Sequence, residues 1–154
     1  MKLSKKCEYA LRALTRLSDP RAPQLISIQE LAKREKIPKK FLEQVLLALK
    51  KAGILQSSRG KTGGYTLHAD PAKVTLGDIT RAVDGPLTPL PCVSTAAPVK
   101  CPGCCSLENC WLRAVMREVG EGMAAVLDQI TVAEICRRAI QSQHKDRHTL
   151  TYDI

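Results

Sequence analysis

Aromatic residues are scarce in this chain of 154 residues, since they make up only 3% of it. The hydrophobic core must therefore be mainly aliphatic. Long hydrophobic runs are also missing: an uninterrupted run such as Val45–Leu49 is far shorter than the about 20 residues that cross a bilayer. The N-terminal segment resembles no signal peptide, because Glu8, Arg12 and Arg16 interrupt it. We therefore expect a cytoplasmic protein, in whose reducing surroundings disulfides rarely persist.

Positive charge is concentrated in one part of the chain. The total is 24 basic and 15 acidic side chains, a formal net charge of +9. Residues 1–90 carry 17 basic and 8 acidic side chains, whereas residues 91–154 carry 7 of each. With 44% hydrophobic and 25% charged residues the chain should be globular. The asymmetry predicts that the first part meets a polyanion.

The basic part has the pattern of a helix-turn-helix. Apolar residues recur every three or four positions over residues 3–18, which predicts a first helix. Ser27 and Glu30 form a capping box at the start of a second, short helix. Pro38 suits the first turn of a third helix, which Gly53 would end. The buried face of that helix is expected to consist of Phe41, Leu42, Val45, Leu46 and Leu49.

Two expected strands, 54–57 and 65–67, flank a glycine-rich basic tip and add a wing to this motif. The third helix would then enter a DNA major groove and the wing would contact phosphates or a minor groove. Lysine, glutamine and glutamate suit guanine, adenine and cytosine edges respectively. The alternative to DNA contact is that Lys39 and Glu43 form only a surface ion pair and that the glycines between the strands only make a tight turn. The residues predicted to contact DNA are Lys39, Lys40, Glu43, Gln44, Arg59 and Lys61.

Cysteines are clustered in the other part of the chain. Five of the seven fall between Cys92 and Cys110, with the spacing C-x8-C-x2-C-C-x4-C. Thiolates are soft ligands that suit zinc or the irons of an iron–sulfur cluster. A single C-x2-C knuckle does not distinguish between these metals, and thiols used for disulfide switching are a third possibility.

The remaining pattern completes a mainly α fold. Leu112, Val115, Val119 and Val126 lie on one stripe of an expected long helix, which packs on its own domain or pairs with a second copy. Another capping box at Thr131 opens a helix to about residue 140. We therefore divide the chain into a winged helix-turn-helix DNA-binding domain (1–85), a cysteine-rich loop (86–110), dimerisation helices (111–141) and a mobile polar tail (142–154).

Several motifs together resemble the IscR/NsrR/CymR-type family of bacterial winged helix-turn-helix transcriptional regulators. The resemblance covers residues 1 to about 140. It implies a homodimer that binds a palindromic DNA operator and, in many members, a [2Fe-2S] or [4Fe-4S] cluster that sets the affinity for DNA. The motifs that carry it are Tyr9-Ala10-Leu11-Arg12, Ile37-Pro38, Phe41-Leu42, Ala52-Gly53-Ile54-Leu55, Ser58-Arg59-Gly60, Gly63-Gly64-Tyr65 and Cys110-Trp111-Leu112-Arg113.

The cysteine spacing departs from the pattern C-x5-C-x5-C of the best-known members. Counting back from Cys110, Cys104 fits the first step, but Pro98 stands at the next position. The expected ligands are therefore Cys92, Cys101, Cys104 and Cys110, with Cys105 as a substitute. Glu8 matches an acidic ligand that the partner subunit supplies in some members, and it is the weaker candidate, the alternative being a solvated helix residue. Arg113 stands where other members have a histidine ligand.

These observations predict a homodimeric transcriptional regulator whose affinity for double-stranded DNA is controlled by an iron–sulfur cluster. Glu43 would help to discriminate between DNA sites, as the resemblance implies. The alternative is a regulator of the same fold that binds zinc or switches through metal-free thiols. We expect no enzyme, because no nucleotide-binding glycine loop and no Cys–His or Ser–His arrangement is present in the sequence.

Overall fold

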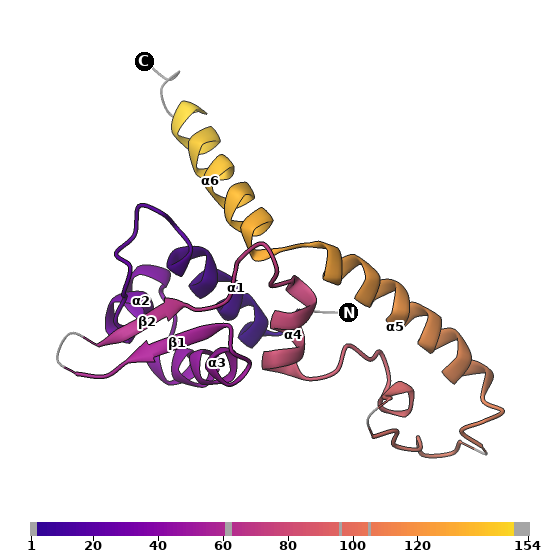
Figure 1. The fold of residues 1–154 in the computed structure, drawn as a ribbon. Coiled ribbons are helices and arrows are strands. Elements are labelled where there is room, and N and C mark those ends of the chain that lie inside the picture. The colour runs from indigo at the N-terminus through magenta and orange to yellow at the C-terminus, as the bar shows by residue number, and fades with distance from the viewer. Residues whose placement is uncertain (1–2, 61–62, 96, 105, 150–154) are drawn as a thin grey trace.

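The computed structural model describes residues 3–60, 63–95, 97–104 and 106–149. A helical body carries a two-stranded hairpin, and a long helix leads away from it beside an irregular loop (Figure 1). This is the mainly helical fold with a small sheet that the sequence predicts. Its elements are α1 (Lys5–Leu17), α2 (Ile28–Glu35), α3 (Lys39–Lys51), β1 (Leu55–Ser58), β2 (Gly64–Leu67), α4 (Leu76–Asp84), the 3-10 helix η1 (Pro91–Val93), α5 (Trp111–Gln129) and α6 (Val132–Thr149).

Side-chain caps begin α1, α2 and α4, whereas α3 and α5 begin without one. The Ser27 hydroxyl accepts a hydrogen bond of 3.2 Å from the Glu30 backbone, which confirms Ser27 as the N-cap of α2. The predicted capping box is not complete, because the Glu30 carboxylate accepts from Arg34 instead of the Ser27 backbone. Thr75 and Asp78 form a reciprocal capping box at the start of α4. Between α2 and α3, Lys36 adopts a left-handed conformation with φ of 52°. That residue ends α2, and Pro38 immediately precedes α3, so the turn between them is short.

The hairpin is held against the body by an isolated β-bridge to the segment before α2. β1 and β2 are antiparallel, with Leu55 opposite Leu67. Ile26 and Tyr65 exchange backbone hydrogen bonds of 3.1 and 2.8 Å. Gly64 makes this contact possible, because a Cβ atom there would lie 2.5 Å from the Ile26 carbonyl oxygen. The wing is therefore tied to the entry of α2 by backbone pairing.

The core is aliphatic, as the scarcity of aromatic residues predicts. The prediction that Phe41 belongs to the buried face of α3 is wrong, because its side chain is 51% exposed. Phe41 lies at the edge of the apolar stripe of α3, and half of its surface remains uncovered. The largest fully buried side chains include Leu14, Ile26, Leu31, Leu42, Val45, Leu46, Leu49 and Ile79.

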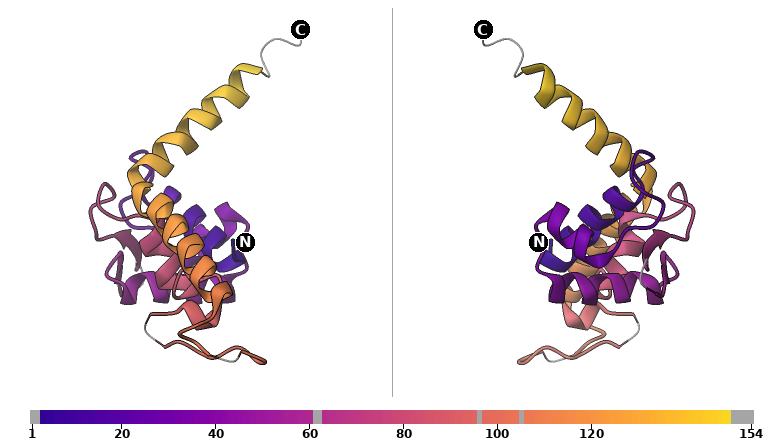
Figure 2. Two further views of the ribbon diagram at one scale, coloured as in Figure 1. Left: turned by 90° about the vertical axis from the view of Figure 1, so that its right-hand side faces the viewer. Right: turned by 90° about the vertical axis from the view of Figure 1, so that its left-hand side faces the viewer.

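The long helix α5 is fastened to the body at its C-terminal end. Thr75 and Thr131 form an isolated antiparallel bridge, and the Leu76 backbone donates to the Ile130 carbonyl oxygen at 2.7 Å. α6 then projects away from the body (Figure 2). It continues to Thr149, well past residue 140, where the sequence predicted its end. The segment from Ile130 onward contains no Gly or Pro, so no residue type in it breaks a helix.

Candidate functional site

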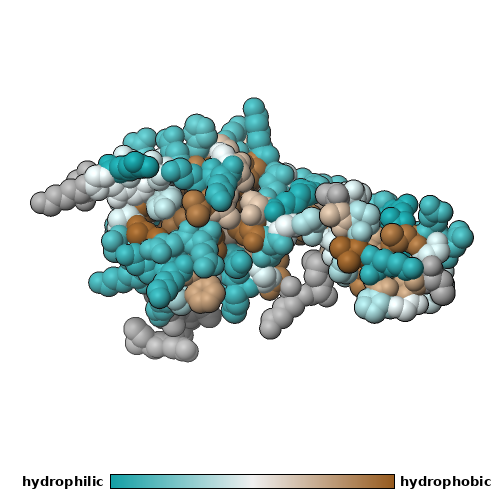
Figure 3. Space-filling view, turned by 90° about the horizontal axis from the view of Figure 1, so that it is seen from below, coloured by the Kyte–Doolittle hydropathy of each residue, from teal (hydrophilic) through white to brown (hydrophobic). Residues whose placement is uncertain are grey.

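The exposed face of α3 carries the residues that the sequence predicts to read DNA. Lys39, Lys40, Glu43 and Gln44 are all exposed. Phe41 and Leu47 add apolar surface to this helix, at 51% and 52% exposure. Seen from below, the body is largely hydrophilic on the side that carries α3 (Figure 3). The exposure of Phe41 does not follow from the sequence, because a periodic pattern does not show which edge of an apolar stripe remains uncovered.

The wing lies beside this helix and is joined to it. Lys50 of α3 donates a hydrogen bond of 2.7 Å to the Ser57 hydroxyl of β1. Arg59 follows β1 and is exposed, whereas Lys61 lies outside the described residues. A surface hollow between Gln29 at the start of α2 and the wing includes Arg59. The structure thus presents the helix, the wing and the start of α2 as one connected unit.

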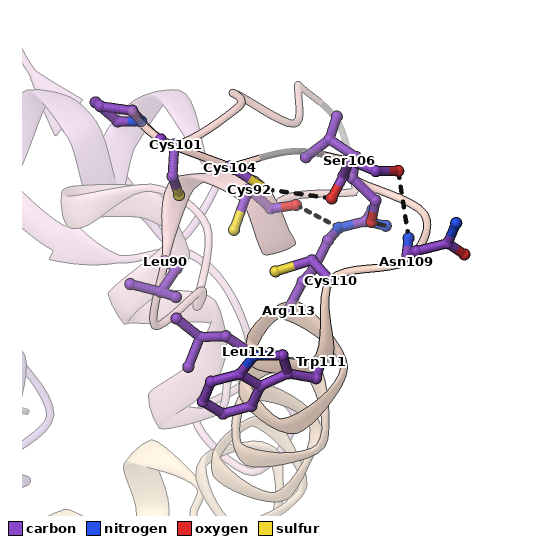
Figure 4. A pocket seen from close by; sticks show the side chains of 13 residues that line it. Leu90, Cys92, Cys101, Cys104, Ser106, Asn109, Cys110, Trp111, Leu112 and Arg113 are labelled. Carbon is purple, nitrogen blue, oxygen red and sulfur yellow. Dashed lines mark hydrogen bonds between the residues drawn. The ribbon is translucent and has the colours of Figure 1, made fainter.

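A second candidate site is the cysteine pocket, a cavity of about 400 Å³ lined by residues of 90–113. All four cysteines predicted to be ligands line it: Cys92, Cys101, Cys104 and Cys110. Figure 4 shows the sulfur atoms of Cys92, Cys101 and Cys110 turned toward its interior. Cys92 is buried in η1, and Cys110 immediately precedes α5. Cys105 lies outside the described residues.

The thiols of the cysteine pocket lie close enough to shift one another's pKa. Burial raises the pKa of Cys92, and the Cys101 thiol and then the Cys110 thiol raise it further. Burial is also the largest cause that raises the pKa of Cys104, and the Cys110 thiol raises it further. Among the described residues, the cysteines are all free thiols, and no three His, Cys, Asp or Glu side chains gather closely enough to hold one metal ion. The four thiols thus surround one cavity without three of them meeting at a single point.

Cys110 differs from the other thiols because of its place at the start of a helix. The backbone N–H of Arg113 is the largest cause that lowers its pKa, and the Cys104 thiol and the Leu112 N–H act in the same direction. Burial opposes this shift. Unpaired N–H groups at a helix N-terminus stabilise a thiolate, so Cys110 deprotonates more readily than an ordinary cysteine.

Arg113 contacts the loop instead of offering a ligand. Its Nε donates to the Cys92 carbonyl oxygen at 2.8 Å, and its Nη1 donates to the Leu107 carbonyl oxygen at 3.0 Å (Figure 4). The resemblance to known regulators places Arg113 where some members have a histidine, but the sequence does not reveal these acceptors, because they are backbone atoms that the fold of the loop brings to Arg113.

Glu8 lies on α1 and pairs with cations of its own helix. Its carboxylate is 2.6 Å from the Lys5 ammonium and 3.8 Å from the Arg12 guanidinium. The hydrogen bond from Lys5 is the largest cause that lowers the pKa of Glu8. Glu8 does not line the cysteine pocket of its own chain. Any role of Glu8 as a ligand would therefore require a second subunit.

An apolar stripe along α5 is exposed in the single chain. Trp111 is 76% exposed, and Val115, Val119 and Val126 are between 43% and 60% exposed. A helix with this much uncovered apolar surface marks an interaction site. The amphipathic stripe predicted from the sequence is therefore present and is not covered by the chain's own domain.

Comparison with known proteins identifies the family. The Rrf2 family model, described as an iron-dependent transcriptional regulator, matches residues 3–138. The chain belongs to the Rrf2 family. An rrf2-like protein of Rhodobacter capsulatus, named as an HTH-type transcriptional regulator, is 39% identical over 136 residues, which cover 86% of this chain and 91% of the relative. The chain is accordingly a transcriptional regulator with a winged helix-turn-helix, not an enzyme.

Solved structures of Rrf2-family regulators share this fold. CymR, the global cysteine regulator of Bacillus subtilis, has a TM-score of 0.68 at 26% identity, over 90% of this chain and 98% of that one. IscR of T. potens also has a TM-score of 0.68 at 26% identity, over 93% and 91% of the two chains. In the described part of this Rrf2-family regulator, no helix is long and apolar enough to cross a membrane.

Proposed function

We propose that this Rrf2-family regulator is a homodimer whose affinity for a palindromic operator is controlled by an iron–sulfur cluster in the cysteine pocket. The observation that carries the proposal is the convergence of Cys92, Cys101, Cys104 and Cys110 on one cavity. Four thiolates are a common ligand set for such clusters. The family description as iron-dependent supports the same assignment. The protein would act in the cytoplasm, together with its DNA.

Four of the described thiols line one cavity, and no three of them are close enough to hold one ion, which favours a cluster over a single ion. Cys92, Cys101, Cys104 and Cys110 would together hold the irons of a [2Fe-2S] or [4Fe-4S] centre. When bound, such a centre exchanges single electrons and is sensitive to oxidants. Cys105 remains a substitute donor, and Glu8 of the partner subunit is a further candidate. The burial of Cys92 would limit solvent access to its side of the site.

The exposed stripe of α5 would form the subunit interface. Pairing this stripe with its copy in a second chain would remove Trp111, Val115, Val119 and Val126 from water. Two winged helices would then be related by a two-fold axis, which matches the symmetry of a palindromic operator. Because Cys110 directly precedes α5, the thiol ligands lie at one end of the interface helix.

The other end of α5 would transmit the state of the cysteine pocket to the DNA-binding domain. Backbone hydrogen bonds fasten Ile130 to Leu76 and Val132 to Val74, at 2.7 and 2.9 Å. A change in the angle of α5 therefore moves α4 and the helices packed on it. Since both recognition helices must meet half-sites at a fixed spacing, such a change alters affinity for DNA.

Sequence reading would come from α3 and phosphate contacts from the wing. Lys39, Lys40, Glu43 and Gln44 face solvent and would reach base edges in the major groove, with Glu43 discriminating between sites. The exposed ring of Phe41 suits the 5-methyl group of thymine. Arg59, together with Lys61, would neutralise phosphates or enter the minor groove.

Metal analysis tests the cluster assignment. The protein is purified without oxygen, and iron, acid-labile sulfide and zinc are measured per chain together with the visible spectrum. Serine variants of the four pocket cysteines should lose iron and sulfide, whereas Cys136→Ala, which changes a buried cysteine outside the pocket, should retain both. Operator binding of the loaded and metal-free protein is then compared at several salt concentrations, and affinity should fall steeply with salt. Loaded and metal-free proteins that bind DNA equally would contradict cluster control.

A thiol switch is the second candidate function. The lowered pKa of Cys110 beside Cys104 gives the pocket a reactive thiolate with a neighbouring thiol. Loss of two electrons and two protons to an external oxidant would join them in a disulfide. If the protein contains no metal at all, this thiol switch is favoured, and if it contains zinc without sulfide, a zinc regulator is favoured. Neither result would change the assignment of the protein as a DNA-binding regulator.

A further inference from the structure

Arg113 joins the two arms of the loop that carries the thiols. Its Nε and Nη1 donate to the carbonyl oxygens of Cys92 and Leu107 at 2.8 and 3.0 Å (Figure 4). Cys92 lies at the beginning of the loop and Leu107 shortly before its end. One planar guanidinium therefore fixes the separation of two chain segments that are distant in sequence.

Backbone hydrogen bonds of the described loop span shorter stretches than the contact between Arg113 and Cys92. The Ser94 and Cys104 N–H groups donate to the carbonyl oxygens of Pro91 and Cys101 at 3.3 and 3.1 Å, and each bond closes a turn. The Val99 N–H donates to the same Pro91 carbonyl oxygen at 3.2 Å, within the first arm of the loop. Arg113 acts over a longer range, because it ties both arms to the first turn of α5.

The chemistry of the guanidinium defines what Arg113 can do here. It remains protonated and has no free lone pair, so it cannot be a ligand. Its charge can offset the repulsion among thiolates gathered in the cysteine pocket. We propose that Arg113 is a positioning residue that closes the cysteine loop before the cluster is bound and counters the negative charge of the ligands afterwards. The second part of this proposal rests on the proposed cluster function.

Hydrogen–deuterium exchange on the reduced, metal-free protein tests the positioning role. In Arg113→Met, amides of 91–109 should exchange about tenfold faster, as expected if one of two charge-assisted hydrogen bonds supplies the protection. Arg117→Met is the matched control, because Arg117 lies one turn later on the same helix and is exposed. Amides of α1 to α4 should be unchanged in both variants. Unchanged exchange in the loop, or equal acceleration throughout the body, would overturn the proposal.

The midpoint potential of the loaded protein tests the effect of charge. A cation near the thiolates stabilises the reduced, more negative cluster, so Arg113→Met should lower the potential. Arg113→Lys keeps the charge but loses the planar fork, and should have faster loop exchange with a potential near that of the unchanged protein. A potential that is the same in Arg113→Met and in Arg117→Met would refute the electrostatic role.

The two measurements separate the two proposals. If the unchanged protein takes up neither iron nor sulfide, the cluster function fails, and the exchange experiment still decides whether Arg113 closes the loop. If the cluster binds and all variants share one exchange pattern and one potential, the cluster function stands and the role of Arg113 is refuted.

Discussion

Arg81 of α4 and Asp128 of α5 form an ion pair in which Nη2 lies 2.6 Å from Oδ2. This contact joins two helices whose residues are 47 positions apart in the chain. Hydrogen bonding between the two side chains raises the pKa of Arg81 and lowers that of Asp128. The pair links the helix that carries the exposed apolar stripe to the DNA-binding domain.

Asp128→Asn should weaken the link between the cysteine pocket and the DNA-binding domain. Both partners are about 40% exposed, so the loss of stability should be at most about 1 kcal/mol. The ratio of operator affinities between loaded and metal-free protein should move toward one. Binding titrations measure this ratio, and Glu118→Gln, which neutralises another exposed carboxylate of α5, is the control. An unchanged ratio in Asp128→Asn would show that the ion pair carries no coupling.

Gly77→Ala should destabilise the protein through Asp128. A Cβ atom at Gly77 would lie 1.8 Å from Asp128 Oδ1 and 2.9 Å from Arg81 Nη1, so the added methyl group must displace the ion pair. The cost should disappear in an Asp128→Ala background. Urea unfolding of the four proteins in this double-mutant cycle should give a coupling of about 1 kcal/mol. Additive effects would contradict the predicted clash.

Phe41→Ala should mainly affect DNA binding and Leu46→Ala should mainly affect stability, although both residues lie on α3. Leu46 is fully buried, so its truncation should cost about 2–5 kcal/mol of unfolding free energy. Phe41 is 51% exposed, so its truncation should cost less, but it should weaken preference for thymine at one operator position. Unfolding curves and selection from a random DNA library measure the two effects. A stability loss in Phe41→Ala as large as that in Leu46→Ala would indicate that Phe41 belongs to the core.

Acid should remove a stabilising contribution of Glu134 at the start of α6. Hydrogen bonds from Arg137 and then Arg138 lower the pKa of its carboxyl group to about 2. Because the folded pKa lies below the ordinary value of 4.5, the contribution is complete above that value and is lost as pH falls toward about 2. The melting temperature of Glu134→Gln should therefore be lower than that of the unchanged protein at pH 6. The difference in melting temperature between the two proteins should become smaller as the pH falls. A difference that does not change with pH would contradict this prediction.

Local sequence determined the helical body and its wing. Ser27 caps α2 and Gly53, with φ of 72°, ends α3, because caps and left-handed turns depend on a few adjacent residues. The spacing of apolar residues likewise predicted the stripe of α5, and the cysteine spacing predicted that thiols gather in one loop. Each of these features depends on residues that belong to one continuous segment of the sequence.

Tertiary structure decided the features that join distant residues. The exposure of Phe41 depends on what packs around the edge of α3, which its own periodicity does not contain. The pairing of Cys92 with Cys101 depends on how the loop folds back. The contact of Arg113 with Cys92, 21 positions earlier, and that of Arg81 with Asp128 depend on how the loop and α5 pack against other elements. Side chains far apart in sequence meet only after that packing is complete, so their contacts follow from the fold and not from local pattern.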